Sequence, residues 1–230
     1  KTWAIFAIVV AAVVGGMIYL STQNRLNVRD ISNDAAMRII PAEARTGNIS
    51  EHTIGNTNGK VVMIEYGDYQ CPGCRTAAPE AKRVAEKYKD HVALVFRNYP
   101  IPSLHPNARA AAAVAEAAGL QGKFWEMHDL LYTNQGAWSN ARAKERTDVF
   151  SGYAKQLGLN VEKFNTDLAS GAVTKKIDFD VAVGRQLQID GTPTFFINGN
   201  KLNLGDASSI ENAVKDALKK AGVAVDKAKS

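Results

Sequence analysis

The chain has 230 residues, of which 46% are hydrophobic and 22% are charged, and it contains only two cysteines. This composition is typical of a globular protein, and two cysteines exclude both a disulfide-dense scaffold and a four-thiolate zinc site. The net charge of +5 is small and the basic residues are not clustered, so we expect no nucleic-acid partner.

The first predicted element is a membrane-spanning helix. Trp3 to Leu20 carries no charge, and at a rise of 1.5 Å per residue it covers roughly 27 Å, close to the thickness of the hydrocarbon core. A cleaved signal peptide and a buried core helix are the alternatives, but no small-x-small cleavage site follows Leu20. We therefore predict a transmembrane anchor over residues 1–21 and a polar linker over residues 22–48.

The next segments predict alternating strands and helices. Val61 to Tyr66 and His91 to Arg97 are short runs of β-branched and apolar residues, which are typical of buried strands. The helical pattern from Pro72 to Tyr88 joins them and predicts a parallel pair with a right-handed crossover. Residues 104–188 show helical patterns only, and Thr194 to Ile197 is a further predicted strand. The fold class is therefore α/β, with a helical insertion.

Both cysteines lie in Cys71-Pro72-Gly73-Cys74, where a predicted strand leads into a helix. Unpaired N–H groups and the helix dipole stabilise a thiolate at this end of a helix, which favours Cys71 as the reactive thiol. Cys74 lies one turn later on the same face and can form a disulfide with Cys71 as the resolving thiol. A zinc half-site, an inert structural disulfide and two unrelated thiols are the alternatives. We predict a redox-active disulfide that needs no metal and no organic cofactor.

Two other positions fit a redox site. Glu65 lies six residues before Cys71 on an otherwise apolar strand. If it is buried, its carboxyl has a raised pKa and can carry the proton of Cys74, whereas an edge-exposed side chain is the alternative. Thr192-Pro193 precedes the strand at Thr194, and a cis peptide bond there would place Pro193 against the active site. An ordinary turn is the alternative.

Three stretches together resemble a known family. EYGDYQCPGC, FRNYPIPSLHPNARAAAAVAEAAGLQGKFWEMHDLLYTNQ and GTPTFFING are similar, in this order, to the DsbA-like branch of the thioredoxin superfamily, which includes BdbD-like proteins. The resemblance covers residues 49–222. It implies a thioredoxin fold over residues 49–230, with an inserted helical subdomain at about 104–188.

The resemblance also implies residue roles. It assigns three catalytic residues: Cys71 as nucleophile, Cys74 as resolving cysteine and Glu65 as buried acid. It places four residues in the active-site and substrate-binding loops: Pro72, Gly73, Thr192 and Pro193, with a cis bond before Pro193 facing the dithiol. His105 matches a family motif position, and we expect a structural role for it. The best-known strong oxidants carry His where this chain has Gly73, which indicates a weaker oxidant.

The predicted function is a thiol–disulfide oxidoreductase that introduces disulfides into cysteine-containing exported proteins. The resemblance implies a bacterial enzyme that is reoxidised by a quinone-linked membrane partner, and we expect a monomer. The reducing cytosol does not favour this chemistry, so we expect a single-pass cell-membrane protein whose catalytic domain faces the extracytoplasmic side. Because the chain begins with Lys1 rather than Met, we expect residues to precede it, and charge counting does not determine the topology.

Two other functions fit the same residues. A disulfide reductase or isomerase uses the same dithiol with electrons moving outward. A non-catalytic, chaperone-like module could bind extended peptides as an added strand at Thr192 and Pro193. These alternatives differ in the direction of electron flow and in their need for Cys71.

Overall fold

The computed structural model describes residues 31–205 and 208–224, together with residues 10, 12, 14 and 15. The predicted membrane span, Trp3 to Leu20, lies almost entirely outside the described residues and stays a prediction. None of the helices in the described part of the chain combines the length and the hydrophobicity that a bilayer span requires.

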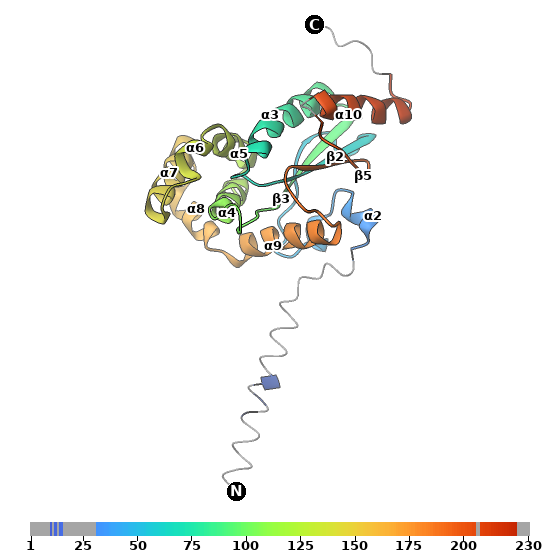
Figure 1. The fold of residues 1–230 in the computed structure, drawn as a ribbon. Helices are drawn as coiled ribbons and strands as arrows, with labels where there is room; N and C mark the ends of the chain where they lie inside the picture. Colours follow the sequence, from blue (N-terminus) through green and yellow to red (C-terminus); the bar gives the residue numbers. More distant parts are fainter. Residues whose placement is uncertain (1–9, 11, 13, 16–30, 206–207, 225–230) are drawn as a thin grey trace.

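A five-stranded mixed sheet forms the centre of the domain, in the order β1-β3-β2-β4-β5 (Figure 1). Its strands are β1 (His52–Gly55), β2 (Val61–Gly67), β3 (Val92–Asn98), β4 (Thr194–Ile197) and β5 (Asn200–Lys201). β2 and β3 are parallel and are joined by α3 (Pro72–Lys87), as the sequence predicts, while the other pairs are antiparallel.

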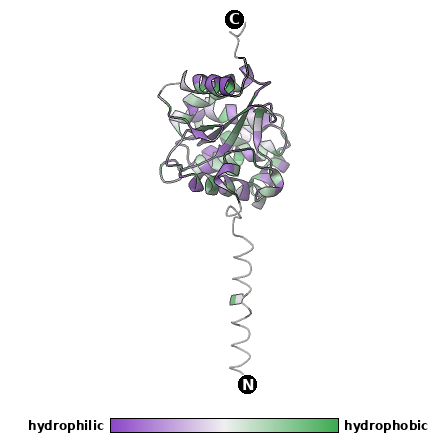
Figure 2. Cartoon of the chain, turned by 90° about the vertical axis from the view of Figure 1, so that its right-hand side faces the viewer, coloured by the Kyte–Doolittle hydropathy of each residue, from purple (hydrophilic) through white to green (hydrophobic). Residues whose placement is uncertain are grey.

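Helices cover both faces and one side of the sheet. Between β3 and β4 the chain forms α4 (Ala108–Gly119), α5 (Phe124–Thr133), α6 (Gln135–Trp138), α7 (Ala143–Gln156), α8 (Val161–Leu168) and α9 (Gly171–Gln186), and α10 (Ser208–Lys220) follows β5. α3 and α10 lie on one face of the sheet and α9 on the other, while α4 to α8 pack beside it (Figure 1). The helices carry hydrophobic and hydrophilic segments side by side, as amphipathic helices do (Figure 2).

The two faces of β2 belong to different cores. Met63 packs with α3 and α10, and Tyr66 packs with α9 on the opposite face. Side chains alternate along a strand, so Glu65 and Gly67 share the face of Met63, which α3 covers. The strand therefore directs the side chain of Glu65 towards the helix that carries the cysteines.

Residues 31–45, which fall in the predicted linker, are packed against the domain. The segment forms the short helix α2 (Asn33–Ala36), and the side chains of Ile31, Ala36 and Ile40 are buried in the same core as residues of α9. The polar composition of this stretch suggested a linker, but its few apolar residues pack on the sheet face beside α9. This part of the predicted linker is thus part of the folded domain.

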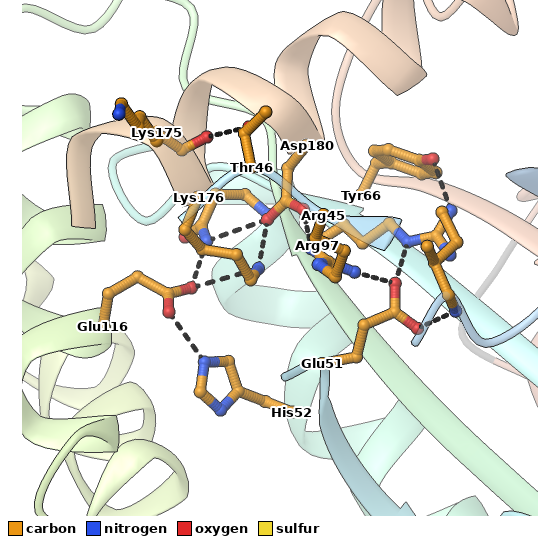
Figure 3. Close-up of polar contacts among 12 residues, drawn as sticks. Arg45, Thr46, Glu51, His52, Tyr66, Arg97, Glu116, Lys175, Lys176 and Asp180 are labelled. Atoms are coloured by element: carbon orange, nitrogen blue, oxygen red, sulfur yellow. Dashed lines mark hydrogen bonds and ion pairs between the residues drawn. The ribbon is translucent and has the colours of Figure 1, made fainter. Parts of the chain in front are cut away.

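Six charged side chains form a buried ionic network between this N-terminal segment, the sheet and the helices (Figure 3). They are at most 1% exposed and include three cations and three carboxylates: Arg45, Arg97, Lys176, Glu51, Glu116 and Asp180. Glu51 accepts hydrogen bonds from Arg45 and, at 2.7 Å, from Arg97. The Lys176 Nζ atom lies 2.6 Å from Asp180 and 3.3 Å from Glu116. Opposite charges therefore balance within the network.

Candidate active site

The two cysteines occupy the junction between β2 and α3. Cys71 is the N-cap of α3, and Pro72 takes the first helical position, where its missing N–H leaves no hydrogen bond unmade. Cys71 is 9% exposed and Cys74 is fully buried. Both are free thiols in this structure. Only Cys71 is therefore open to a thiol or disulfide that approaches from solvent.

The surroundings move the pKa values of the two thiols in opposite directions. Hydrogen bonds from the Cys74 thiol, and then from the backbone N–H groups of Cys74 and Gly73, lower the pKa of Cys71 to about 5 against the opposing effect of burial. Burial raises the pKa of Cys74 well above its usual value, and the neighbouring charges of Cys71 and Glu65 raise it further. At neutral pH this arrangement favours a thiolate at Cys71 and a thiol at Cys74.

Glu65 is buried close to the dithiol, as its position on β2 requires. Its side chain is 1% exposed, and burial raises the pKa of its carboxyl to about 8. A carboxyl with this pKa is mostly protonated at neutral pH but can still ionise, so it can give a proton to a more basic group nearby. The edge-exposed alternative for Glu65 is wrong, because β2 is an inner strand between β3 and β4.

The loop before β4 packs against the cysteines. The peptide bond between Thr192 and Pro193 is cis, as the resemblance implies. Sγ of Cys71 lies 3.3 Å from the carbonyl oxygen of Thr192 and donates a hydrogen bond to it when the thiol is protonated. A Cβ atom on Gly73 would lie 3.2 Å from Cδ of Pro193 and 3.6 Å from Sγ of Cys71. The structure thus brings all the predicted loop residues together around Cys71, the more accessible of the two thiols.

Comparison with known proteins agrees with this geometry. The family described as thioredoxin matches residues 47–219. The chain belongs to the thioredoxin family. A thioredoxin-like oxidoreductase from Silicibacter pomeroyi is 27% identical, with a TM-score of 0.61, and the match covers 77% of this chain and 95% of that one.

Two DsbA-like structures share the fold of this thioredoxin-family chain. Alpha-DsbA1 from Wolbachia pipientis is 19% identical with a TM-score of 0.68, and the match covers 83% of this chain and 98% of that one. Oxidised BdbD from Bacillus subtilis is 21% identical with a TM-score of 0.63, over 74% of this chain and 93% of that one. The predicted membership of the thioredoxin superfamily is confirmed, and the predicted resemblance to DsbA-like proteins is confirmed at the level of the fold.

Curated relatives place a similar segment within longer proteins. Na+/H+ antiporter NhaA 1 from Salinispora arenicola is 38% identical over 151 residues, which is 66% of this chain and 22% of that protein. Na+/H+ antiporter NhaA 1 from Mycolicibacterium gilvum is 33% identical over 171 residues, which is 72% of this chain and 26% of that protein. The chain thus spans about a quarter of the length of these relatives, and the transport activity in their names is not carried over to it.

A polar residue that sequence reasoning missed holds the thioredoxin-family site together. The buried carboxylate of Asp68 accepts hydrogen bonds from the backbone N–H groups of Gln70 at 2.8 Å and Ile101 at 2.9 Å. His105 lies 2.9 Å from the same carboxylate through Nδ1, in line with the structural role expected for it. The backbone N–H of Asp68 in turn donates to Sγ of Cys74 at 3.4 Å. The position of Asp68, three residues before Cys71, could have identified it from the sequence, because Asp favours turns that precede helices.

Gln135 is a second missed residue. Its amide donates to the carbonyl oxygens of Tyr69 at 2.9 Å and Cys71 at 3.1 Å, so α6 fixes the backbone that leads into α3. No local pattern marks this contact, because it joins residues 64 positions apart. Within the described residues, no cluster of three or more His, Cys, Asp or Glu side chains is arranged to hold a metal ion.

Proposed function

We propose that this chain is the catalytic part of a membrane-anchored oxidase that introduces disulfides into exported proteins. Trp3 to Leu20 would hold the domain at the extracytoplasmic side of the cell membrane, where disulfides persist. The fold of DsbA-like proteins and the relation to a thioredoxin-like oxidoreductase support the chemistry. The disulfide between Cys71 and Cys74 would be the only redox group it needs.

The opposite pKa shifts of the two thiols carry the proposal. A Cys71 thiol with a pKa of about 5 is ionised at neutral pH, which stabilises the reduced form of the enzyme. Stabilising the reduced form makes the disulfide a stronger oxidant and makes Cys71 a good leaving group. Gly73 supplies no side chain to stabilise the thiolate further, so we expect an oxidant of intermediate strength.

The reaction uses three residues of the site. A substrate thiolate attacks Sγ of Cys71, the bond between Cys71 and Cys74 breaks, and Cys74 leaves with the electron pair. Glu65, which is mostly protonated at neutral pH, gives its proton to the more basic Cys74 sulfur. The second substrate thiolate then attacks the substrate sulfur of the mixed disulfide, which forms the substrate disulfide and releases Cys71 as a thiolate. The substrate leaves oxidised, and the enzyme has gained two electrons.

The reduced enzyme must then be reoxidised. We propose a quinone-linked membrane protein as the electron acceptor, because an anchored domain meets membrane partners repeatedly at short range. Since Cys74 is fully buried, the acceptor would exchange with Cys71, the same sulfur that the substrate attacks. Substrate and acceptor therefore cannot occupy the site together.

Mixing the oxidised chain with a reduced dithiol peptide tests the direction of electron flow. We expect the peptide to become oxidised while Cys71 and Cys74 become thiols, because the Cys71 thiolate favours the reduced enzyme. Mass spectrometry after acid quenching and thiol labelling measures both changes. A peptide that stays reduced, together with rapid reduction of a disulfide peptide by the reduced chain, would favour the reductase alternative instead.

A further inference from the structure

The backbone of Asp68 contacts both cysteines of the dithiol. Its N–H group donates a hydrogen bond to Sγ of Cys74 at 3.4 Å, and its carbonyl oxygen accepts one from the N–H of Cys71 at 3.1 Å. Asp68 is 1% exposed and Cys74 is fully buried, so the contact between the N–H and the sulfur is shielded from solvent. A protein donor therefore points at a sulfur that water cannot stabilise.

The peptide unit that carries this N–H is held from its other side as well. The carbonyl oxygen of Gly67 belongs to the same peptide unit and accepts a hydrogen bond from the N–H of Tyr99 at 2.8 Å. Gly67 is the last residue of β2, and Tyr99 follows the last residue of β3, its parallel neighbour in the sheet. The two inner strands thus fix the direction in which the N–H of Asp68 points.

The side chain of Asp68 fixes the loop that follows β3. One carboxylate oxygen accepts from the N–H of Gln70 at 2.8 Å. The other accepts from the N–H of Ile101 at 2.9 Å and lies 2.9 Å from Nδ1 of His105. Any movement of Asp68 that breaks these contacts leaves buried polar groups unpaired, which costs free energy. The carboxylate therefore holds Asp68 in place, and with it the N–H that points at Cys74.

A negative charge develops on Cys74 during the exchange reaction. When a thiolate attacks Sγ of Cys71, the bond to Cys74 breaks and its electron pair stays on the Cys74 sulfur. Until the proton from Glu65 arrives, this sulfur is a buried thiolate, a form that burial disfavours. A donor that already points at the atom where charge develops lowers the barrier, because it needs no reorientation in the transition state.

We propose that the N–H of Asp68 stabilises the departing Cys74 thiolate, and that the Asp68 carboxylate is the positioning group that holds this N–H in place. The inference rests on the proposed function, in which Cys74 is the leaving sulfur. The N–H donates a hydrogen bond and transfers no proton, so the proton that Cys74 takes up still comes from Glu65. Asp68 thus affects the cleavage of the disulfide and not the intrinsic reactivity of Cys71.

Asp68→Ala tests the positioning role, because it removes the carboxylate and leaves the backbone N–H in the chain. The oxidised chain is reduced by excess dithiothreitol in a single turnover and followed by acid quenching and thiol labelling. We expect D68A to be about 10-fold slower than the wild type, less than the roughly 100-fold or more expected when a donor is lost outright. Alkylation of reduced Cys71 by iodoacetamide should keep the wild-type rate, because it breaks no bond to Cys74.

Asn107→Ala is the matched control. Asn107 is 7% exposed, and its amide donates to the carbonyl oxygens of Trp138, Ser139 and Ala141 at 3.0–3.1 Å. These contacts join the loop after β3 to the end of α6 and not to Asp68. N107A should therefore lower stability, because it also leaves buried polar groups unpaired, and keep the wild-type rate with dithiothreitol.

The outcomes separate this inference from the proposed function. If D68A reacts with dithiothreitol as fast as N107A, the positioning role is wrong and the proposed function stands. If D68A slows alkylation as much as cleavage, Asp68 shapes the whole site and the inference is also wrong. Should D68A fail to fold, D68N decides, because it keeps one acceptor oxygen and must still be slower in cleavage alone.

Two results for the wild type complete the test. A wild type that does not exchange with dithiothreitol would overturn the proposed function and this inference together. A wild type that proves to be a reductase would overturn the proposed direction only. The disulfide between Cys71 and Cys74 then forms through the same transition state by which it breaks, so D68A must again be the slower variant.

Discussion

Replacing Cys71 by serine is expected to abolish disulfide exchange and to leave the fold intact. Serine is close to cysteine in size and can still donate to the carbonyl oxygen of Thr192, the hydrogen bond that Cys71 makes at 3.3 Å. Its hydroxyl forms no disulfide, so neither the mixed disulfide nor the bond to Cys74 can form. Peptide oxidation should fall to the uncatalysed rate, and circular dichroism should show unchanged secondary structure.

Cys74→Ser is the matched control for this variant. It keeps the more accessible thiol, Cys71, and removes the fully buried one, so a substrate disulfide should be captured as a mixed disulfide at Cys71. A non-reducing gel detects this species directly. If Cys71→Ser still promoted the folding of a cysteine-containing substrate as well as the wild type does, the proposed oxidase function would be contradicted and the chaperone-like alternative supported.

Replacing Asp180 by alanine is expected to lower the free energy of unfolding by about 3–5 kcal/mol, the range found when one partner of a buried ion pair is removed. The Asp180 carboxylate accepts hydrogen bonds from Arg45, from Lys176 at 2.6 Å and from the backbone N–H of Asn98 at 3.1 Å. Its loss leaves three buried cations, Arg45, Arg97 and Lys176, with only two buried carboxylates, Glu51 and Glu116 (Figure 3). Urea unfolding followed by fluorescence measures the change.

Asp178 provides a control on the same helix. Its pair with Arg109, at 2.6 Å, is about 40% exposed, so D178A should cost about 0–1 kcal/mol. Asp180→Asn keeps one acceptor oxygen for the N–H of Asn98 and should lose less stability than D180A. Equal losses for D180A and D178A would show that the buried ionic network does not stabilise the domain.

The parts of the fold predicted from sequence are those with a strong local pattern. β2 and β3 are apolar runs, and a proline at the first helical position marks the start of α3 beside the cysteines. The resemblance then supplied the fold, and the structure places Glu65, Thr192 and Pro193 around the dithiol as it implied.

The buried polar contacts were not predictable in the same way. Lys175 and Lys176 are adjacent in sequence, yet Lys175 is exposed and Lys176 is fully buried. The helical period indicates that Lys176 is buried, because Lys176 and Asp180 share a face of α9 with the buried residue Val173. Which charges pair across that face depends on how α9 docks on the sheet, and no local pattern records this.

Measuring the reduction potential of the Cys71–Cys74 couple against pH examines both thiols at once. Below the Cys71 pKa of about 5, reduction takes up two protons with two electrons; above it, Cys71 stays a thiolate and reduction takes up one. The potential should therefore fall by about 60 mV per pH unit below this point and by about 30 mV above it. The bend in this plot reports the Cys71 pKa in the reduced enzyme.

The value of that potential at pH 7 is the most direct test of the proposed oxidase. The low pKa of Cys71, together with Gly73 in place of His, predicts a value between about −270 mV, as in thioredoxin, and about −120 mV, as in DsbA. A potential at or below that of thioredoxin would contradict the proposal and identify the chain as a reductase.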